Sequence, residues 1–262
     1  MPLYKQQQGC PNKPTLVFLH GFLGSSQDWN ETIDLLKDDF HCIAIDLPGH
    51  GASVTVAGSL KDGFNHCHGL IKNILDELNI QQYSMIGYSL GGRIALDYAR
   101  SQNDPRLCAL ILESSHIGLN DLHTKERRFM HDHNWAKIFA THSMRESLTE
   151  WYEQEIFSNL SDRKKEQFIA KREHNYGVPL ANMLLATSLS KQECALPYLQ
   201  QTKLPVHYLV GARDKKFKMI AKQLNTLSDL NNITVTEFED AGHNIHQENA
   251  QQYVQCITQK IK

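Results

Sequence analysis

Apolar runs of strand length recur along the chain and carry little polar alternation. Six of them predict strands, at residues 15–20, 41–46, 83–87, 107–113, 206–211 and 233–239. The segments between these runs predict helices, at residues 28–38, 60–79, 91–102, 216–228 and 247–261. Continuously apolar strands that alternate with helices are typical of a parallel sheet covered on both faces. The pattern therefore predicts an α/β fold with a mostly parallel sheet.

One long stretch interrupts this alternation. Between residues 118 and 190 no strand pattern occurs, and the chain is helical and rich in charged and aromatic residues. We predict that residues 118–190 form a helical cap, whereas residues 1–117 and 191–262 form the α/β core. Because open α/β sheets bind ligands at the carboxyl ends of their strands, the cap would cover the binding site.

Length and charge narrow the range of partners. A chain of 262 residues can build one large domain with an insertion. The formal net charge is −2 and no long basic run is present, so we expect no nucleic-acid partner. No stretch reaches the roughly 20 apolar residues that span a bilayer, and the N-terminus lacks an apolar signal region. We expect a soluble, cytoplasmic protein; a monomer is compatible with the sequence, which leaves the oligomeric state open.

Cysteines and histidines give no metal-binding pattern. The six cysteines are scattered and form no C-x-x-C pair, so neither a disulfide framework nor a zinc site is indicated. The clusters at 66–68 and 131–133 contain two histidines each but lack further ligands at zinc spacing. We therefore predict no metal site.

A serine between glycines stands out at the end of the third predicted strand. Gly87, Ser89 and Gly91 match the G-x-S-x-G pattern, and the residues that follow have helical spacing. In this pattern small residues allow a tight strand-to-helix turn that exposes the serine hydroxyl above a sheet. Glycine and serine are also ordinary turn residues, so the pattern needs support from a base and an acid elsewhere.

Two later loops supply that support. Asp214 follows the predicted strand 206–211, and His243 follows the strand at 233–239. The order Ser89, Asp214, His243 is the order of a triad built on an α/β-hydrolase sheet. A serine hydroxyl needs an imidazole to accept its proton, and the imidazole needs a carboxylate to fix its tautomer. Asp46 is the alternative acid, but its Pro- and Gly-rich surroundings favour a structural turn.

An oxyanion hole is predicted from two backbone N–H groups. Phe22 follows the first predicted strand, and Leu90 follows the serine. Their N–H groups would face negative charge that develops on a substrate oxygen. A glycine-rich turn is the plainer interpretation of the segment at Phe22, and the two interpretations are compatible.

These motifs resemble those of the α/β-hydrolase superfamily over nearly the whole chain. The matching segments are "FLHGFLGSSQDW", "IDLPGHGAS", "GYSLGGRIALDYA", "GARDKKF" and "AGHNIHQEN". The superfamily contains esterases, C–C hydrolases, dehalogenases and lyases, so the fold alone does not choose the reaction.

Arginines near the serine and in the cap discriminate among these reactions. Arg93 lies one helical turn after the serine, and the cap contains Arg127, Arg128 and Arg172, together with Trp151. Guanidinium groups bind carboxylates in bidentate pairs, so converging arginines indicate a substrate with several carboxylates. Each cap arginine taken alone is better explained as part of a solvated helix surface.

Core and cap together resemble one narrower family, the 2-succinyl-6-hydroxy-2,4-cyclohexadiene-1-carboxylate synthases of menaquinone biosynthesis. Its segments include "GYSLGGR", "ESSHIGL", "ERRF", "WYEQEIF", "REHNYG", "MLLATSL", "GARDKKF" and "AGHNIHQEN". The resemblance implies a lyase that eliminates pyruvate from a tricarboxylate, 2-succinyl-5-enolpyruvyl-6-hydroxy-3-cyclohexene-1-carboxylate, without adding water.

The same resemblance implies a role for each site residue. Ser89, activated by His243 and Asp214, would remove a proton alpha to the succinyl carbonyl. Further implied roles are stabilisation of negative charge by the N–H groups of Phe22 and Leu90, carboxylate binding by Arg93, Arg128 and Arg172, and shaping of the pocket by Tyr88 and Trp151. The choice between Arg127 and Arg128 stays open. No cofactor is expected.

The residues alone leave two alternative functions open. A carboxylesterase, thioesterase or C–C hydrolase of this fold would use Ser89 as a nucleophile and form an acyl-enzyme. The second alternative is a non-catalytic binding protein of this fold, against which the complete triad argues.

Overall fold

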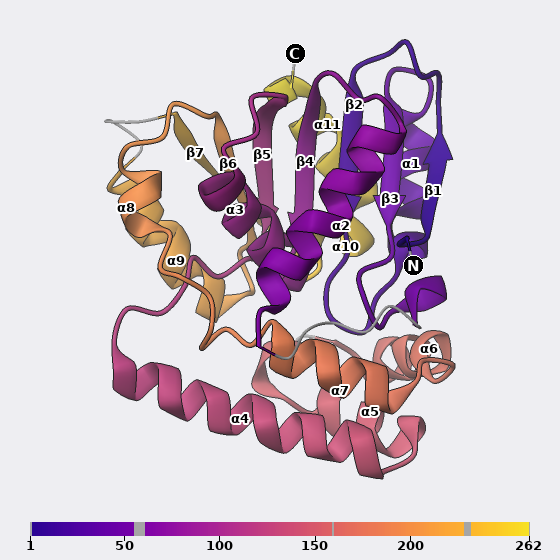
Figure 1. Ribbon diagram of the computed structural model, residues 1–262. Coiled ribbons are helices and arrows are strands. Elements are labelled where there is room, and N and C mark those ends of the chain that lie inside the picture. The colour runs from indigo at the N-terminus through magenta and orange to yellow at the C-terminus, as the bar shows by residue number, and fades with distance from the viewer. Residues whose placement is uncertain (1, 55–60, 159, 228–231, 262) are drawn as a thin grey trace.

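The computed structural model describes residues 2–54, 61–158, 160–227 and 232–261, which form a seven-stranded sheet flanked by helices (Figure 1). The strands are β1 (Lys5–Gln8), β2 (Thr15–Leu19), β3 (His41–Ile45), β4 (Tyr83–Tyr88), β5 (Leu107–Glu113), β6 (Val206–Gly211) and β7 (Ile233–Phe238). Their order across the sheet is β1-β3-β2-β4-β5-β6-β7. All neighbouring pairs are parallel except β1 and β3. The prediction of a mostly parallel sheet is confirmed.

The first strand was missed by the apolar pattern. The sequence of β1 is KQQQ, and it pairs antiparallel with β3 at the edge of the sheet, with Lys5 opposite Ile45. It is held by backbone pairing and by polar side chains: Gln6 Nε2 donates to the backbone oxygen of Ser26 at 2.9 Å. An edge strand half exposed to water needs no apolar run, so apolar patterning could not reveal it.

Helices cover both faces of the sheet, as predicted. They are α1 (Asn30–Leu36), α2 (Gly63–Glu77), α3 (Leu90–Gln102), α8 (Leu196–Leu199), α9 (Lys215–Asn225), α10 (Ile245–Glu248) and α11 (Ala250–Ile261). Residues 60 and 228, at the ends of two predicted helices, lie outside the described residues. In the described part of the chain no helix is long and apolar enough to cross a membrane. The cytoplasmic location and the oligomeric state stay predictions.

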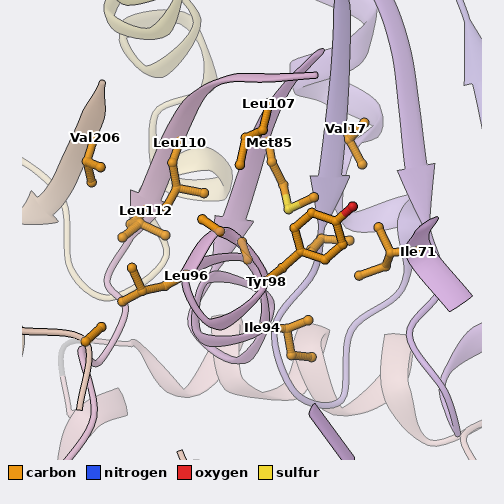
Figure 2. Close-up of a cluster of buried hydrophobic side chains, with 14 of the residues drawn as sticks. Val17, Ile71, Met85, Ile94, Leu96, Tyr98, Leu107, Leu110, Leu112 and Val206 are labelled. Atoms are coloured by element: carbon orange, nitrogen blue, oxygen red, sulfur yellow. The ribbon is translucent and has the colours of Figure 1, made fainter. Parts of the chain in front are cut away.

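Successive residues of a strand point to opposite faces of the sheet and pack into two separate apolar clusters. This explains why the strands are continuously apolar. Figure 2 shows one cluster, in which Val17, Met85 and Leu110 of three strands pack with Ile94 and other residues of α3. The second cluster joins the opposite strand faces to α1 and α11. Every residue of β2, β3, β4 and β6 is buried, so a polar side chain has no solvated face to occupy.

The segment predicted to be the cap is mainly helical and contains no strand in its described part. It contains α4 (Leu122–Thr141), α5 (Met144–Tyr152), the short 3₁₀ helix η3 (Glu155–Phe157), α6 (Asp162–Arg172) and α7 (Gly177–Ala186). These helices share an apolar cluster built around Trp135, Phe139, Leu148 and Leu180. In Figure 1 they lie across the carboxyl ends of the parallel strands. The boundaries at 117/118 and 190/191 stay a prediction, and α4–α7 are called the cap below.

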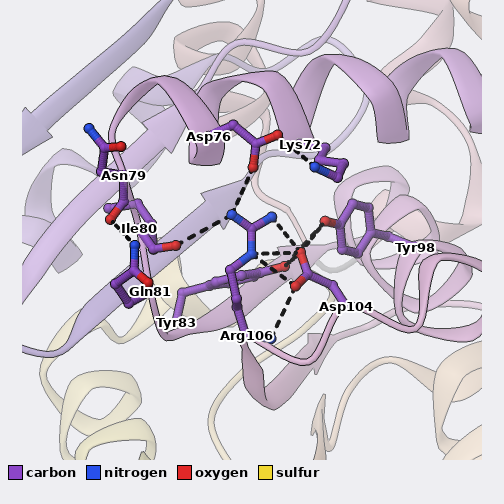
Figure 3. Close-up of polar contacts among 9 residues, drawn as sticks. All are labelled: Lys72, Asp76, Asn79, Ile80, Gln81, Tyr83, Tyr98, Asp104 and Arg106. Atoms are coloured by element: carbon purple, nitrogen blue, oxygen red, sulfur yellow. Dashed lines mark hydrogen bonds and ion pairs between the residues drawn. The ribbon is translucent and has the colours of Figure 1, made fainter.

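A polar network ties the amino-terminal ends of β4 and β5 to α2 (Figure 3). Asp104 accepts hydrogen bonds from the hydroxyls of Tyr98 at 2.8 Å and Tyr83 at 3.1 Å, and from Arg106 Nη2 at 2.8 Å. Arg106 also pairs with Asp76 at 2.8 Å. Burial alone would raise the pKa of Asp104, but the hydrogen bonds from Arg106 and Tyr98 outweigh it and hold that pKa below its ordinary value.

We expect Asp104→Ala to lower the free energy of unfolding by about 3 kcal/mol, because it removes the acceptor shared by two buried hydroxyls and one of the two carboxylates that pair with Arg106. The folded-state pKa of Asp104 is depressed, so its contribution to stability is present above the unfolded value of 3.8 and is lost as pH falls below it. Denaturant unfolding of both proteins at about pH 7 and about pH 3 should show the difference shrinking at low pH. An equal difference at both values would contradict this account.

Candidate active site

Ser89 lies on a strained turn between β4 and α3. Its backbone has φ 49° and ψ −105°, a region that residues with side chains rarely adopt. The turn brings backbone segments into contact: a Cβ on Gly87 would lie 2.6 Å from the oxygen of Gly91, and one on Gly91 would lie 2.2 Å from the oxygen of Leu19. Only glycine fits at these two positions, and the turn that results places Ser89 at the carboxyl end of β4.

The structure brings Asp214 and His243 to this serine. Asp214 follows β6 and caps α9, where its side chain accepts the N–H of Phe217 at 3.2 Å. His243 follows β7, and its Nδ1 lies 2.6 Å from Asp214 Oδ2, while its Nε2 lies 3.4 Å from Ser89 Oγ. The carboxylate accepts the proton of Nδ1, so Nε2 faces the serine hydroxyl as an acceptor. Both Asp214 and His243 are buried.

Asp46, the alternative acid, lies in a different place. Its two carboxylate oxygens accept the backbone N–H groups of Ser26 at 2.6 Å and Ala52 at 2.8 Å. The bond from Ala52 closes the turn after β3, and the bond from Ser26 ties this turn to the segment after β2. Asp46 makes no hydrogen bond to His243. The geometry therefore pairs the imidazole with Asp214.

The loop after β2 packs against the serine turn. A Cβ on Gly21 would lie 2.6 Å from the ring of Tyr88 and 3.6 Å from Cβ of Ser89. The backbone N–H groups of Phe22 and Leu90, the predicted oxyanion donors, have no hydrogen-bond acceptor among the described residues. Two donors without acceptors next to a serine hydroxyl are what an oxyanion hole requires before substrate binds.

Two buried histidines fix this loop. His50 Nε2 accepts the N–H of Leu23 at 3.1 Å, and His20 Nε2 accepts the N–H of Leu47 at 2.9 Å. Burial lowers the pKa of His20, and burial together with the neighbouring His20 lowers the pKa of His50 to about 3. Each ring is therefore neutral and able to accept with Nε2, so the loop after β2 is tied to the loop after β3.

A cavity of about 860 Å³ opens beside the serine, between the core and the cap. Its walls include Phe22, Ser89, Leu90, Trp151, Asp214 and His243, together with the cationic residues Arg93, Arg127, Arg128, Arg213, Lys215 and Lys216. Asp214 and Glu155 are the acidic residues of its lining, and Asp214 is paired with His243. The cavity is therefore electropositive and suits an anionic ligand.

Arg93 enters the cavity from the first turn of α3. Its Nη1 donates to the backbone oxygen of Thr187 at 2.7 Å, and its guanidinium lies 6.0 Å from the ring centre of Phe64. Burial, followed by repulsion from Arg128, lowers the pKa of Arg93 to about 9. A bound carboxylate would relieve both effects, since it adds a negative charge and hydrogen-bond acceptors.

Arg127 and Arg128 both line this cavity, so the structure does not choose between them. Arg128 Nε donates to Asp132 at 2.8 Å, and Asp132 also accepts the hydroxyl of Ser188 at 2.7 Å. Arg127 is exposed, and no carboxylate of the described chain lies within ion-pair distance of it. Arg128 is thus the better fixed of the two.

Arg172 and Tyr88 line a second, smaller cavity instead. This cavity, of about 40 Å³, shares Phe22, Trp151 and His243 with the larger one. The sequence predicted one set of binding residues, whereas the structure distributes them over two adjoining cavities. Trp151 stands between the two and contacts Phe22, with their ring centres 5.1 Å apart.

Several cavity residues were missed in the sequence, among them Lys216 and His116. Lys216 lies two positions after Asp214, and its closeness in the sequence to a predicted triad residue at a strand end could have identified it. His116 follows β5; its Nδ1 accepts the N–H of Gly118 at 3.0 Å. Burial, followed by the charges of Lys216 and Arg93, lowers the pKa of His116 to about 3, so this ring is neutral and its Nε2 carries the proton.

The described residues contain no group of three or more His, Cys, Asp or Glu side chains placed to hold a metal ion. The chemical groups around Ser89 are an imidazole, a carboxylate, two backbone N–H groups without an acceptor and several cations.

Comparison with known proteins decides the family. The family model described as alpha/beta hydrolase fold matches residues 14–250. The 2-succinyl-6-hydroxy-2,4-cyclohexadiene-1-carboxylate synthase of Klebsiella pneumoniae is 38% identical over 251 residues, which are 96% of this chain and 95% of that protein. The chain belongs to this synthase family. The α/β-hydrolase fold predicted from the motifs is confirmed.

Other relatives agree with membership in the synthase family. The synthase of Escherichia fergusonii is 36% identical over 98% of this chain and 97% of that protein. The solved structure of MenH from S. aureus superposes with a TM-score of 0.85 at 27% identity, covering 98% of this chain and 97% of that one. A carboxylesterase of Nitrososphaera gargenis superposes with a TM-score of 0.80 at 20% identity, which reflects the shared fold alone.

Proposed function

We propose that this protein eliminates pyruvate from 2-succinyl-5-enolpyruvyl-6-hydroxy-3-cyclohexene-1-carboxylate, with Ser89 as the general base. The product would be 2-succinyl-6-hydroxy-2,4-cyclohexadiene-1-carboxylate, the compound that gives the synthase family its name. The observation that carries this proposal is the cationic cavity around the serine, because it suits a substrate with three carboxylates. An esterase for neutral substrates would have no use for buried arginines there.

The names of substrate and product define the reaction. A proton leaves C2, which is alpha to the succinyl carbonyl, and its electron pair forms a double bond to C3. The ring double bond moves from C3–C4 to C4–C5, and the C5–O bond breaks with release of enolpyruvate. No water is consumed, and the enolpyruvate becomes pyruvate when its carbon is protonated.

The proposed roles follow from the geometry of the triad. His243 takes the proton of Ser89 Oγ, and Asp214, 2.6 Å from Nδ1, stabilises the imidazolium that forms. The serine oxygen then removes the C2 proton. Negative charge develops on the succinyl carbonyl oxygen, where the N–H groups of Phe22 and Leu90 would stabilise it.

The cations would hold the three carboxylates. Arg93 and Arg128 act from the larger cavity, and Arg172 acts from the smaller one, next to Tyr88. Trp151 shapes the boundary between the cavities. Binding at several points would orient C2 toward the serine and hold the C5–O bond in place for cleavage.

Release of pyruvate by the purified protein tests the proposal. The wild-type protein is mixed with the enolpyruvyl substrate, and pyruvate is followed with a coupled dehydrogenase. We expect catalytic release with saturation at increasing substrate. Absence of release, with turnover of small neutral esters instead, would favour the esterase alternative.

We expect activity to survive removal of divalent metal ions, because proton transfer and elimination need only the acid–base groups named above. The measurement is the initial rate of pyruvate release before and after dialysis against a chelator. The two rates should agree within error, and a loss of rate that is restored by one metal ion would contradict the expectation.

A further inference from the structure

Arg172 is a buried cation with one carboxylate partner on the core. It lies at the end of α6, is 6% exposed, and its Nη2 lies 3.3 Å from Asp28 Oδ2. Its Nε and Nη1 are buried and have no hydrogen-bond partner in the described part of the chain. Burial of a guanidinium with two unused hydrogen-bond donors costs free energy unless a further acceptor is supplied. The side chain lines the smaller cavity, so that acceptor would sit there.

Asp28 connects this arginine to the loop that carries Phe22. It lies in the 3₁₀ helix η1 (Ser26–Trp29), directly after that loop, and its Oδ2 accepts the N–H of Ser25 at 3.4 Å. Its Oδ1 pairs with Lys171 at 2.6 Å. A Cβ on residue 24 would lie 2.3 Å from Asp28 Oδ2, so Gly24 makes room for the carboxylate.

Charge keeps Asp28 ionised in this buried place. Burial would raise the pKa of its carboxyl, but Arg172 and Lys171 outweigh that effect and hold the pKa below its ordinary value. One carboxylate thus faces two cations, so these three side chains together carry a net positive charge. The carboxylate of Glu248, which also lines the smaller cavity, accepts the N–H groups of Gly242 and Asn244 instead. The surplus charge, with the two unused donors of Arg172, suits one more carboxylate.

A second contact joins the cap to the same loop. Asn175 Nδ2 donates to the backbone oxygen of Leu23 at 3.0 Å. The loop that carries Phe22 is therefore bound to the cap on both sides of Gly24, and Asp28 supplies the charged half of this connection.

We propose that Asp28 is a positioning residue that holds Arg172 in the orientation that binds a substrate carboxylate. Asp28 does not touch the substrate in this proposal; it acts through Arg172. The proposal rests on the proposed function for the identity of the substrate, although any polycarboxylate that reaches Arg172 would be affected in the same way.

The test is a double-mutant cycle on KM for pyruvate release. We expect Asp28→Asn to raise KM by about tenfold to a hundredfold and to change kcat by less than about threefold, because Arg172 binds a carboxylate that takes no part in bond cleavage. Arg172→Met should raise KM at least as much. Adding Asp28→Asn to Arg172→Met should change KM by less than about twofold, since the residue through which Asp28 acts is already gone.

Glu166→Gln is the matched control. Glu166 also lies on α6 and pairs with an arginine, Arg145, but both side chains are exposed on the cap surface. The KM of Glu166→Gln should therefore equal that of the wild type. If Asp28→Asn does not fold, Arg172→Met and the double variant can still be compared, because both lack the unpaired buried cation. A KM of the double variant more than about twofold above that of Arg172→Met would then overturn the proposal. A further rise of KM in the double variant, as large as that in the wild-type background, would overturn the proposal.

Binding of tricarballylate, measured by calorimetry, separates this proposal from the proposed function. Absence of pyruvate release by the wild type would overturn the proposed function alone. For the Asp28 proposal we expect tricarballylate to bind the wild type at least tenfold more tightly than Asp28→Asn. Equal affinity of the two proteins, or no measurable binding by the wild type, would overturn it.

Discussion

Ser89→Ala and His243→Ala should each lower kcat for pyruvate release by about a hundredfold to ten-thousandfold, the range typical of a positioned general base. Asp214→Asn should fall in the same range, because the amide no longer fixes the imidazole tautomer or stabilises its charge. The effects should not add: Ser89→Ala combined with His243→Ala should be as slow as either variant alone, since the two residues move one proton. Steady-state kinetics of the single and double variants provide the measurement.

Thermal unfolding of each variant is the control, because a loss of turnover counts only if the protein remains folded. Asp46→Asn is the matched comparison for the acid. Asp46 accepts one backbone N–H group from the turn after β3 and one from Ser26, so Asp46→Asn should lower the free energy of unfolding but change kcat little. A nearly silent Asp214→Asn beside an inactive but folded Asp46→Asn would show that the acid has been assigned wrongly.

Replacement of Arg93 or Arg172 by Ala should lower kcat/KM for the tricarboxylate by roughly thirtyfold to several thousandfold. Each change leaves a desolvated carboxylate without its partner, at a cost of about 2 to 5 kcal/mol. Arg128→Ala should cost less, because Arg128 is 25% exposed and water can partly replace it. Lysine should restore only part of the activity at any of the three sites, since it keeps the charge but loses the planar fork.

Two comparisons distinguish a binding role from general damage. Arg163→Ala changes an exposed arginine on α6 that lines neither cavity, so it should leave kcat/KM unchanged. Hydrolysis of a small neutral ester, where detectable, should be barely affected by the arginine variants, because that substrate has no carboxylate to bind. Equal losses on both substrates would indicate global damage, and no loss on the tricarboxylate would remove the argument for a polycarboxylate substrate.

Local sequence rules account for most of the fold and for the placement of the triad. Buried parallel strands must be apolar on both faces, so β2 through β6 were visible as apolar runs. The serine turn was visible because close backbone contacts require glycine at 87 and 91. Asp214 and His243 could be placed because carboxyl ends of neighbouring parallel strands meet at one edge of the sheet.

Features that depend on contacts between distant segments could not be predicted. The edge strand β1 depends on backbone pairing with β3 and has no apolar pattern. Arg172, which lines the smaller cavity, contacts Asp28, which lies 144 positions earlier in the sequence. His116 reaches the larger cavity from the loop after β5, and its spacing along the chain does not indicate this. Nothing in the local sequence indicates which charged side chains a folded cap will bring to a cavity.

The mass of the ring product tests the central claim most directly. Pyruvate alone does not decide the reaction, because hydrolysis of the enol ether would release it too. The purified protein is incubated with the enolpyruvyl substrate, and the products are analysed by mass spectrometry with the ultraviolet spectrum. Elimination predicts a conjugated cyclohexadiene whose mass is that of the substrate minus pyruvate, formed in equal amount with pyruvate. A ring product heavier by one water, without the diene absorbance, would contradict the account.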